Sequence, residues 1–149
     1  MKKKTISDLL KEKGASILSI NENVDVGEAV AVMNVEKVGS LLVKDDSGSY
    51  TGIITERDLL THLGTCSEDL CTYKVKEIMS KDLICASPDD TLDKASNVMI
   101  ENRIRHLPIV SKKEVVGVIS MKDIVNFIRS GLEEETKYLR DYITDEYPR

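Results

Sequence analysis

Apolar residues along this chain follow two alternating patterns, and each pattern occurs twice. In two segments the apolar positions lie three or four residues apart, which is the spacing of one face of an α-helix. These positions are Val26, Ala29, Val30 and Met33, and then Leu92, Ala95, Val98 and Met99. After each segment, two short apolar runs flank a polar turn, "SLLV" and "TGIIT" first and "LPIV" and "VVGVIS" later, which predicts a β-hairpin. Because "ERDLLTHL" and "MKDIVNFI" then return to helical spacing, we expect each half to read strand, helix, strand, strand, helix.

The two halves also match residue by residue. The stretch "GIITERDLLTHLG" aligns with "GVISMKDIVNFIRSG", and both keep a glycine, two β-forming residues, a hydroxyl and an aspartate in the same order. Met33 and Met99 lie 66 residues apart, whereas Asp58 and Asp123 lie 65 apart, so one residue is lost in the hairpin turn. Because one such unit buries little apolar surface alone, we expect an α+β fold in which both repeats pack into one module.

The repeat divides the chain into four parts. We expect repeat 1 at 5–64, a connector at 65–80, repeat 2 at 81–130 and a helical extension at 131–149. The connector carries the apolar residues Val75, Ile78 and Met79. It is therefore expected to dock on the repeats rather than to form a free linker.

The C-terminal extension has the pattern of an amphipathic helix. Leu132, Leu139 and Ile143 fall on one helical face with acidic residues opposite, which predicts an exposed helix. A solvated face is the simplest interpretation, and contact with a partner chain is the alternative. Because the predicted helices carry more apolar residues than one module needs to cover, we also expect a homodimer.

Composition and charge narrow the classes of partner. The chain has 149 residues, of which 41% are apolar, as in an ordinary globular protein. Its formal net charge of −5 argues against nucleic acid or an anionic membrane as a partner. No apolar run is long enough to cross a bilayer, and the N-terminal stretch lacks the apolar core of a signal peptide, so we expect a cytoplasmic protein. The odd set of cysteines, Cys66, Cys71 and Cys85, fits reduced thiols in that compartment.

Four motifs together resemble those of a known family. They are "VKEIMSKD", "SPDDTL", "NRIRHLPIV" and the doubled Gly-h-h-(Thr/Ser)-x-x-Asp, in which h is apolar. From about Thr5 to Arg129 the chain resembles a tandem pair of CBS domains, called a Bateman module, of the stand-alone prokaryotic type. The resemblance implies two pseudo-symmetric clefts that bind an adenosine-containing ligand such as AMP, ADP, ATP or S-adenosylmethionine. It also implies a sensor that passes its signal to a partner protein, with no reaction catalysed and no cofactor.

The repeated motif offers polar groups that suit such a ligand. Asp58 and Asp123 can each accept two hydrogen bonds from a ribose diol, and one such charge-assisted bond contributes about 1.5 to 3 kcal/mol. Thr55 and Ser120 lie at a strand-to-helix junction, where a hydroxyl caps the helix or binds a phosphate. The (Thr/Ser)-x-x-Asp pattern is also that of a capping box, so capping alone is the competing interpretation of either copy. Duplication together with the other motifs favours ligand binding.

The resemblance further implies which residues line each cleft. The cleft at Asp58 would take Thr55, Asp58, Ile84, His106, Pro108 and Lys122. The cleft at Asp123 would take Ser120, Asp123, Arg105, Leu18, Leu42 and Arg57. Ile84 in the first of these clefts and Leu18 in the second would pack against the base, although both also suit plain core positions. Repeat 1 has Gly39, Ser40 and Leu42 where repeat 2 has Arg105, His106 and Pro108. The two clefts are therefore chemically unequal.

Other chemistries have little support in the sequence. His62, Cys66 and Cys71 do not have the spacing of common zinc sites, and no third group orients a Cys–His nucleophile pair. The chain also has no glycine-rich phosphate loop. We therefore predict a non-catalytic regulatory module that binds an adenosine nucleotide, and the alternative is a scaffolding protein of the same fold that binds none. The carboxylates Asp58 and Asp123 argue against scaffolding, because a purely structural cleft has no use for them.

Overall fold

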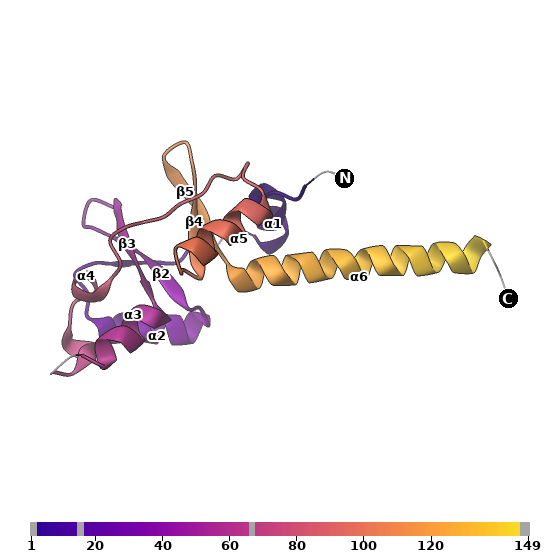
Figure 1. The fold of residues 1–149 in the computed structure, drawn as a ribbon. Helices are drawn as coiled ribbons and strands as arrows, with labels where there is room; N and C mark the ends of the chain where they lie inside the picture. The colour runs from indigo at the N-terminus through magenta and orange to yellow at the C-terminus, as the bar shows by residue number, and fades with distance from the viewer. Residues whose placement is uncertain (1–2, 15–16, 66–67, 147–149) are drawn as a thin grey trace. The chain divides into compact units, whose positions relative to one another are not determined.

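The chain forms two compact units in the computed structural model, which describes residues 3–14, 17–65 and 68–146 (Figure 1). One unit is Ser16–Ile84, and the other joins Met1–Ala15 to Cys85–Arg149. Each unit contains a β-hairpin that leads into a helix. The mixed helix and strand content of both units agrees with the predicted α+β class.

The first unit follows the predicted order of elements. Its elements are β1 (Ser19–Asn21), α2 (Val26–Glu36), β2 (Ser40–Lys44), β3 (Tyr50–Thr55), α3 (Glu56–Leu63), the 3-10 helix η1 (Leu70–Thr72) and α4 (Val75–Ile78). Strand β1 pairs in parallel with β2, and β2 pairs antiparallel with β3. The order strand, helix, strand, strand, helix is therefore confirmed in this unit.

The turn of the first hairpin is held by one carboxylate. Asp45 accepts hydrogen bonds from the Ser47 hydroxyl at 2.6 Å, the Ser47 N–H at 2.9 Å and the Ser49 N–H at 3.0 Å. The Ser47 hydroxyl and these N–H groups hold the pKa of Asp45 below its ordinary value. Gly48 follows with a φ of +88°, a backbone conformation that favours glycine. The polar turn read from the sequence is thus a specific hydrogen-bonded structure.

The core of the first unit gathers side chains from helices, strands and the connector. Its buried members are Val26, Ala29, Met33, Leu41, Val43, Ile54, Leu70, Val75 and Ile78. Because Val75 and Ile78 belong to the connector, the prediction that the connector docks is confirmed. Ser80 then pairs with Ile53 of β3 through two backbone hydrogen bonds of 2.9 and 3.0 Å. A Cβ on Gly52 would approach the Ser80 carbonyl oxygen to 2.6 Å, so this close pairing requires glycine at position 52.

The second unit has a shorter sheet. Its elements are α1 (Ile6–Lys13), α5 (Leu92–Glu101), β4 (His106–Ser111), β5 (Glu114–Ser120) and α6 (Met121–Glu146). Strands β4 and β5 pair antiparallel, and the first strand expected in this half is reduced to a single bridge between Ala86 and Ile109. The strand cannot extend, because the next N–H, that of Ser87, bonds the Asp90 carboxylate at 2.9 Å and begins a turn.

Pro108 lies inside β4 although proline has no N–H to donate to a sheet. Its carbonyl oxygen accepts a hydrogen bond from the Ala86 N–H at 3.0 Å. The register between β4 and β5 shifts directly after it, between Ile109 and Val110. Because the nitrogen and the carbonyl of a strand residue point to the same side, the missing donor faces Ala86, where only a single bridge forms, and not β5.

Helix α1 comes first in the chain but packs with the second half. The Ile6 N–H donates to the Asp90 carbonyl at 2.9 Å, and Ile6 and Leu9 are buried. A Cβ on Gly117 would lie 2.9 Å from a methyl carbon of Leu10, so α1 rests directly on β5. In the same way, α4 precedes the second repeat in sequence but packs in the first unit. The compact units are therefore not the consecutive sequence repeats: α1, at the start of the expected repeat 1, packs in the second unit, and α4 of the connector packs in the first.

Helix α6 runs without a break from Met121 to Glu146, so the last helix of the second repeat and the predicted extension are one helix (Figure 1). Its first turns pack against α1 and α5, where Ile124 is buried. From Arg129 to Ile143 every residue is exposed. The prediction of an exposed helix is confirmed for this stretch.

Candidate functional site

The start of α3 holds Thr55 and Asp58 against each other. Thr55 is the N-cap, and its hydroxyl accepts a hydrogen bond from the Asp58 N–H at 3.3 Å. The Oδ2 atom of Asp58 accepts from the Thr55 N–H at 2.9 Å and from the Thr55 hydroxyl at 3.1 Å. Its Oδ1 atom accepts from the hydroxyl of Ser80 at 3.0 Å. The Asp58 carboxylate therefore caps the helix with one oxygen and binds a connector hydroxyl with the other.

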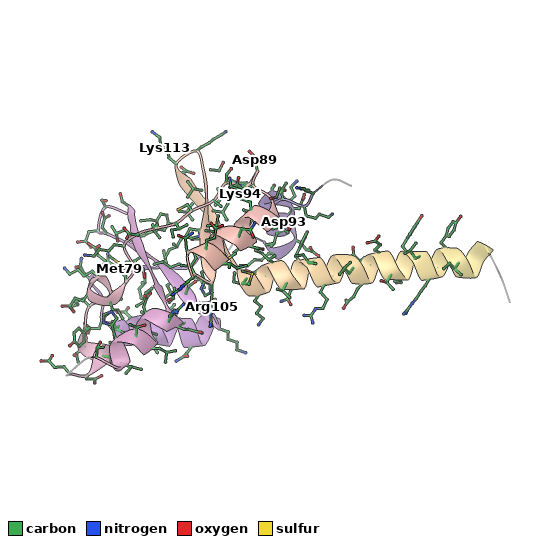
Figure 2. All side chains as sticks on the ribbon, viewed as in Figure 1. Met79, Asp89, Asp93, Lys94, Arg105 and Lys113 are labelled. Atoms are coloured by element: carbon green, nitrogen blue, oxygen red, sulfur yellow. The ribbon has the colours of Figure 1, made fainter. Side chains whose placement is uncertain are left out.

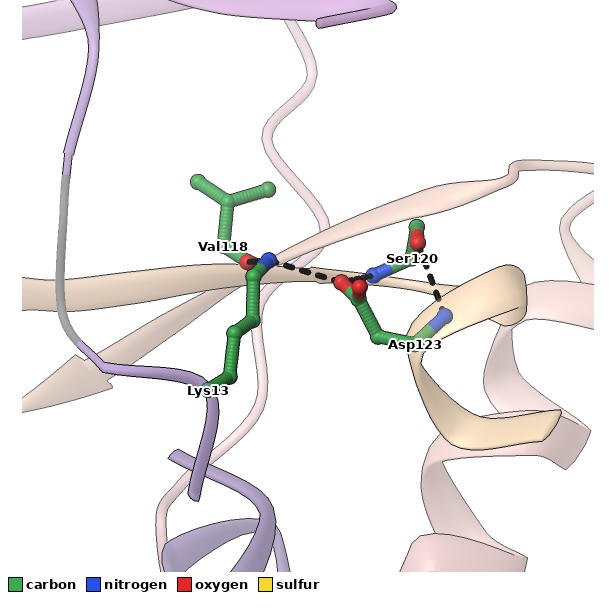
Figure 3. Close-up of polar contacts among 4 residues, drawn as sticks. All are labelled: Lys13, Val118, Ser120 and Asp123. Atoms are coloured by element: carbon green, nitrogen blue, oxygen red, sulfur yellow. Dashed lines mark hydrogen bonds and ion pairs between the residues drawn. The ribbon is translucent and has the colours of Figure 1, made fainter. Parts of the chain in front are cut away.

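The start of α6 repeats this arrangement with one chemical difference. The Ser120 N–H donates to Oδ2 of Asp123 at 2.8 Å, and the Asp123 N–H donates to the Ser120 hydroxyl at 3.0 Å. The additional donor here is a cation, because Nζ of Lys13 lies 2.7 Å from the same Oδ2 (Figure 3). Nζ of Lys13 also donates to the Val118 carbonyl at 2.8 Å. The last turn of α1 thereby delivers a positive charge to the Asp123 carboxylate.

Two opposing effects act on the Asp123 carboxyl. Partial burial by itself would raise its pKa, but the Lys13 ammonium and the Ser120 N–H outweigh that effect and hold the pKa below its ordinary value. The group is therefore ionised at neutral pH. Sequence reasoning missed Lys13, because 110 residues separate it from Asp123. The basic last turn of α1 is visible in the sequence, but it does not indicate on which repeat the helix packs or which carboxylate Lys13 contacts.

Both copies of the motif form capping boxes, so the competing interpretation of the sequence describes real geometry. The same box occurs at the start of α1, where Thr5 and Asp8 cap the helix outside the predicted clefts. Capping does not exclude ligand binding, because a carboxylate offers about four lone-pair positions. At Asp58 and Asp123 the cap uses Oδ2.

The first unit holds four further predicted site residues. Leu18 is partly buried and packs against the core, which agrees with its interpretation as a core residue. Leu42 is buried in β2, and Arg57 is exposed in the first turn of α3. Ile84 is half-buried at the end of the unit.

The second unit holds the other predicted site residues. Arg105 is exposed and directly precedes β4 (Figure 2), and Lys122 is exposed at the start of α6. His106 is half-buried and Pro108 is buried, both in β4. His106 lies opposite Ser120 in the register of β4 and β5, so these two side chains share one face of the hairpin. Each predicted cleft combines residues of both units, and the composition of the clefts stays a prediction.

In the part of the chain that the structure describes, no three His, Cys, Asp or Glu side chains gather around a common point. These residues therefore give no support to a metal centre. His62 lies in the last turn of α3, Cys71 is an exposed free thiol in η1, and Cys66 lies outside the described residues. Partial burial raises the pKa of the Cys85 thiol. Across residues 3–14, 17–65 and 68–146, no helix has both the length and the apolar character needed to span a bilayer.

Comparison with known proteins identifies the family. The sequence model of the CBS domain matches twice, at residues 6–65 and 75–130. The chain belongs to the CBS domain family. The two matches correspond to the two repeats found in the sequence, and the predicted fold of two CBS repeats followed by a C-terminal helix is confirmed.

Individual members of the family align along most of the chain. A mitochondrial CBS domain-containing protein of Arabidopsis thaliana is 34% identical over 151 residues, which cover 96% of this chain and 73% of that protein. The crystal structure of a CBS-domain protein from Agrobacterium tumefaciens has a TM-score of 0.79 at 30% identity, over 82% of this chain and 91% of that chain. The CBS domain pair of protein MJ0100, in complex with 5'-methylthioadenosine and S-adenosyl-L-methionine, has a TM-score of 0.71 at 23% identity, over 87% of this chain and 99% of that chain. The last likeness concerns the fold alone.

Proposed function

We propose that this CBS protein is a non-catalytic regulatory module that binds an adenosine-containing ligand at Asp58 and Asp123. The observation that carries the proposal is the duplicated geometry, in which each unit places a half-buried carboxylate at a strand-to-helix junction beside a capping hydroxyl. The CBS domain pair of MJ0100 was solved with two adenosine compounds, which supports this ligand class. The ligand is AMP, ADP, ATP or S-adenosylmethionine, and the module needs no cofactor.

The ribose diol is the part of the ligand that the carboxylates recognise. At Asp58, the Ser80 hydroxyl on Oδ1 is a neutral donor, so a ribose hydroxyl can replace it with little change in hydrogen-bond energy. At Asp123, the Lys13 ammonium and the Ser120 N–H both bond Oδ2. A ribose hydroxyl bonding Oδ1 would leave both contacts in place. Leu18 and Ile84 are assigned to the adenine base, and Leu42 and Pro108 to the apolar walls.

Charge makes the two clefts different. Arg105 and Arg57 are assigned to the Asp123 cleft, and Lys13 adds a third cation next to its carboxylate. Guanidinium groups stay charged and form forked bonds to phosphate, so this cleft should prefer ligands with several phosphates. The Asp58 cleft has Lys122 and His106 by assignment, and the donor beside its carboxylate is a neutral hydroxyl. It should therefore discriminate less between phosphorylated and other adenosine compounds.

The remaining parts of the proposal concern the setting of the module. The protein acts in the cytoplasm as a homodimer and passes the state of its clefts to a regulated protein partner. It engages neither nucleic acid nor a membrane, in agreement with its net charge of −5. The second candidate function is scaffolding without nucleotide, which the capping role of both aspartates would permit.

Isothermal titration calorimetry with the four ligands tests the proposal. We expect Asp58→Ala and Asp123→Ala each to weaken binding in its own cleft by about tenfold to a hundredfold, the loss of one charge-assisted contact. Asp8→Ala is the matched control, because it removes the same capping box outside the clefts. Asp8→Ala and Asp58→Ala should each lose about 1 kcal/mol of stability, and Asp123→Ala more, because it also removes the contact with Lys13. Asp8→Ala should keep wild-type affinity. A wild-type protein that binds none of the four ligands would favour scaffolding instead.

A further inference from the structure

A carboxylate that binds a ribose diol carries a negative charge, and this charge repels the phosphates of the same ligand. In the second unit, the pair formed by Lys13 and Asp123 balances that charge. Nζ of Lys13 lies 2.7 Å from Oδ2 of Asp123 and also donates to the Val118 carbonyl at 2.8 Å, so two contacts fix the ammonium beside the carboxylate. At a distance larger than their separation, the two opposite charges nearly cancel. A ligand phosphate would therefore meet a nearly neutral pair.

The Lys13–Asp123 pair is open to a ligand. Its two side chains are 37% and 24% exposed, and both line a groove of about 170 Å³ in the second unit. An ammonium has three N–H donors, and the contacts with Asp123 and Val118 use two of them. The third can serve an oxygen of the ligand. Glu12 also lines the groove, but its side chain is exposed, so solvent screens its charge more effectively.

The corresponding donor in the first unit is uncharged. At Asp58 the hydroxyl of Ser80 takes the place of the ammonium, with its oxygen 3.0 Å from Oδ1. A hydroxyl donates a hydrogen bond but leaves the negative charge of the carboxylate in place. The chain thus carries the same motif twice, once with a cation on the carboxylate and once with a neutral donor.

We infer that Lys13 is a specificity-determining residue, which allows the Asp123 cleft to accept adenosine ligands that carry phosphates. This inference rests on the proposed function, because it concerns the ligand that Asp123 binds there. Without Lys13, the Asp123 carboxylate would repel an anionic ligand and attract a cationic one. At a separation of about 8 Å and an effective dielectric constant of about 40, each unit charge on the ligand changes the dissociation constant about fivefold. The effect of Lys13 should therefore depend on the sign of the ligand charge.

Isothermal titration calorimetry with ligands of different charge tests this inference. The measurements use Asp58→Ala protein, in which the Asp123 cleft is intact, with and without Lys13→Met. The probes are ADP, which is anionic, adenosine, which is uncharged, and S-adenosylmethionine, which has a net positive charge. We expect Lys13→Met to weaken ADP binding at least about fivefold, to change adenosine binding less than about twofold and to strengthen S-adenosylmethionine binding. Lys13→Arg keeps the charge and should keep the wild-type order of affinities.

Two further variants separate the charge of Lys13 from its structural role. Lys74→Met removes the ammonium of a similar ion pair, 2.8 Å from Asp25 in the first unit, and changes the net charge by the same amount. It should leave all three affinities unchanged. Lys13→Gln is a second neutral variant, whose amide can still donate a hydrogen bond to Asp123. It should give the same order of affinities as Lys13→Met, and it replaces that variant if Lys13→Met does not fold.

The outcomes separate this inference from the proposed function. A wild-type protein that binds none of the adenosine compounds overturns the proposed function and this inference with it. If the protein binds them but the neutral variants weaken ADP and adenosine equally, Lys13 has only a structural role and this inference alone is overturned. The same holds if the affinity for ADP is unchanged, if Lys13→Arg behaves like Lys13→Met, or if Lys74→Met alters the order of affinities in the same way.

Discussion

Removing the Lys13 ammonium should destabilise the second unit. The expected loss in free energy of unfolding follows from the contacts that Lys13 makes. Lys13 bonds the Asp123 carboxylate at 2.7 Å and the Val118 carbonyl at 2.8 Å, and so joins α1 to β5 and α6. The two side chains are 37% and 24% exposed, so solvent screens part of the attraction. A fully exposed ion pair contributes about 0.2 to 1 kcal/mol, and a hydrogen bond to a charged group about 1.5 to 3 kcal/mol. We therefore expect Lys13→Met to lower the free energy of unfolding by about 1 to 2 kcal/mol.

A double-mutant cycle isolates the pair. Urea unfolding is measured for the wild type, Lys13→Met, Asp123→Asn and the double variant, where asparagine keeps an oxygen for the Ser120 N–H. The coupling energy at pH 7 should be about 1 kcal/mol. The control cycle uses Lys74 and Asp25, which lie 2.8 Å apart but whose side chains are 49% and 54% exposed. Its coupling should be smaller, because the more exposed pair is better screened.

The contribution of the Lys13–Asp123 pair to stability should also depend on pH, in a direction that the pKa of Asp123 determines. The pKa of Asp123 is lower in the folded state than its ordinary value, so its contribution to stability is present above the unfolded pKa of about 3.9. The contribution is lost as the pH falls through the folded pKa. The difference between wild type and Lys13→Met should therefore shrink in strongly acidic solution. A coupling energy that is zero at pH 7, or that grows on acidification, would refute the reasoning.

Replacing glycine by alanine should have opposite effects on stability at two positions, and thermal unfolding measures both. Gly52→Ala should destabilise by about 1 to 3 kcal/mol, because the new Cβ would lie 2.6 Å from the Ser80 carbonyl oxygen, a backbone atom that cannot move without breaking the pairing of Ser80 with Ile53. Gly131→Ala should stabilise by about 0.5 to 1 kcal/mol, because it lies inside α6 with no atom within 4 Å of the new Cβ. Equal effects of the two substitutions would contradict the packing described for β3.

Local pattern was enough to predict most elements of the fold. The apolar spacing of α2 and α5 and the paired runs of both hairpins are periodic signals that burial of one face imposes, and those elements form as predicted. The prediction is wrong for the first strand of the second half, which the structure reduces to a single bridge. Its length is set by the hydrogen bond from Ser87 to Asp90, a side-chain contact that strand periodicity does not encode. The place of α1 could not be read either, because it depends on whether Leu10 fits over Gly117, more than a hundred residues away.

For the candidate site too, the sequence predicts some residues, and others become visible only in the structure. Thr55, Asp58, Ser120 and Asp123 could be found because the chain carries their motif twice, and the structure gives both copies the same capping geometry. The groups that bind the carboxylates from outside, Ser80 and Lys13, belong to segments without a repeat signal of that kind. Their contacts arise only once each segment packs in the unit of the other repeat.

The two carboxylates also differ in what lies beyond them. Asp58 is in the first turn of α3, which ends at Leu63. Asp123 is in the first turn of α6, a helix that is exposed from Arg129 to Ile143. A ligand that binds Asp123 as we propose would act on the start of this long helix, and it would meet Lys13 of α1, which packs against α6. If the ligand binds dimer and monomer with different affinity, dimerisation must change ligand affinity by the same factor. In the proposed function, a ligand at Asp123 would therefore bear directly on the long helix α6, whereas a ligand at Asp58 would bear on α3, a helix of eight residues.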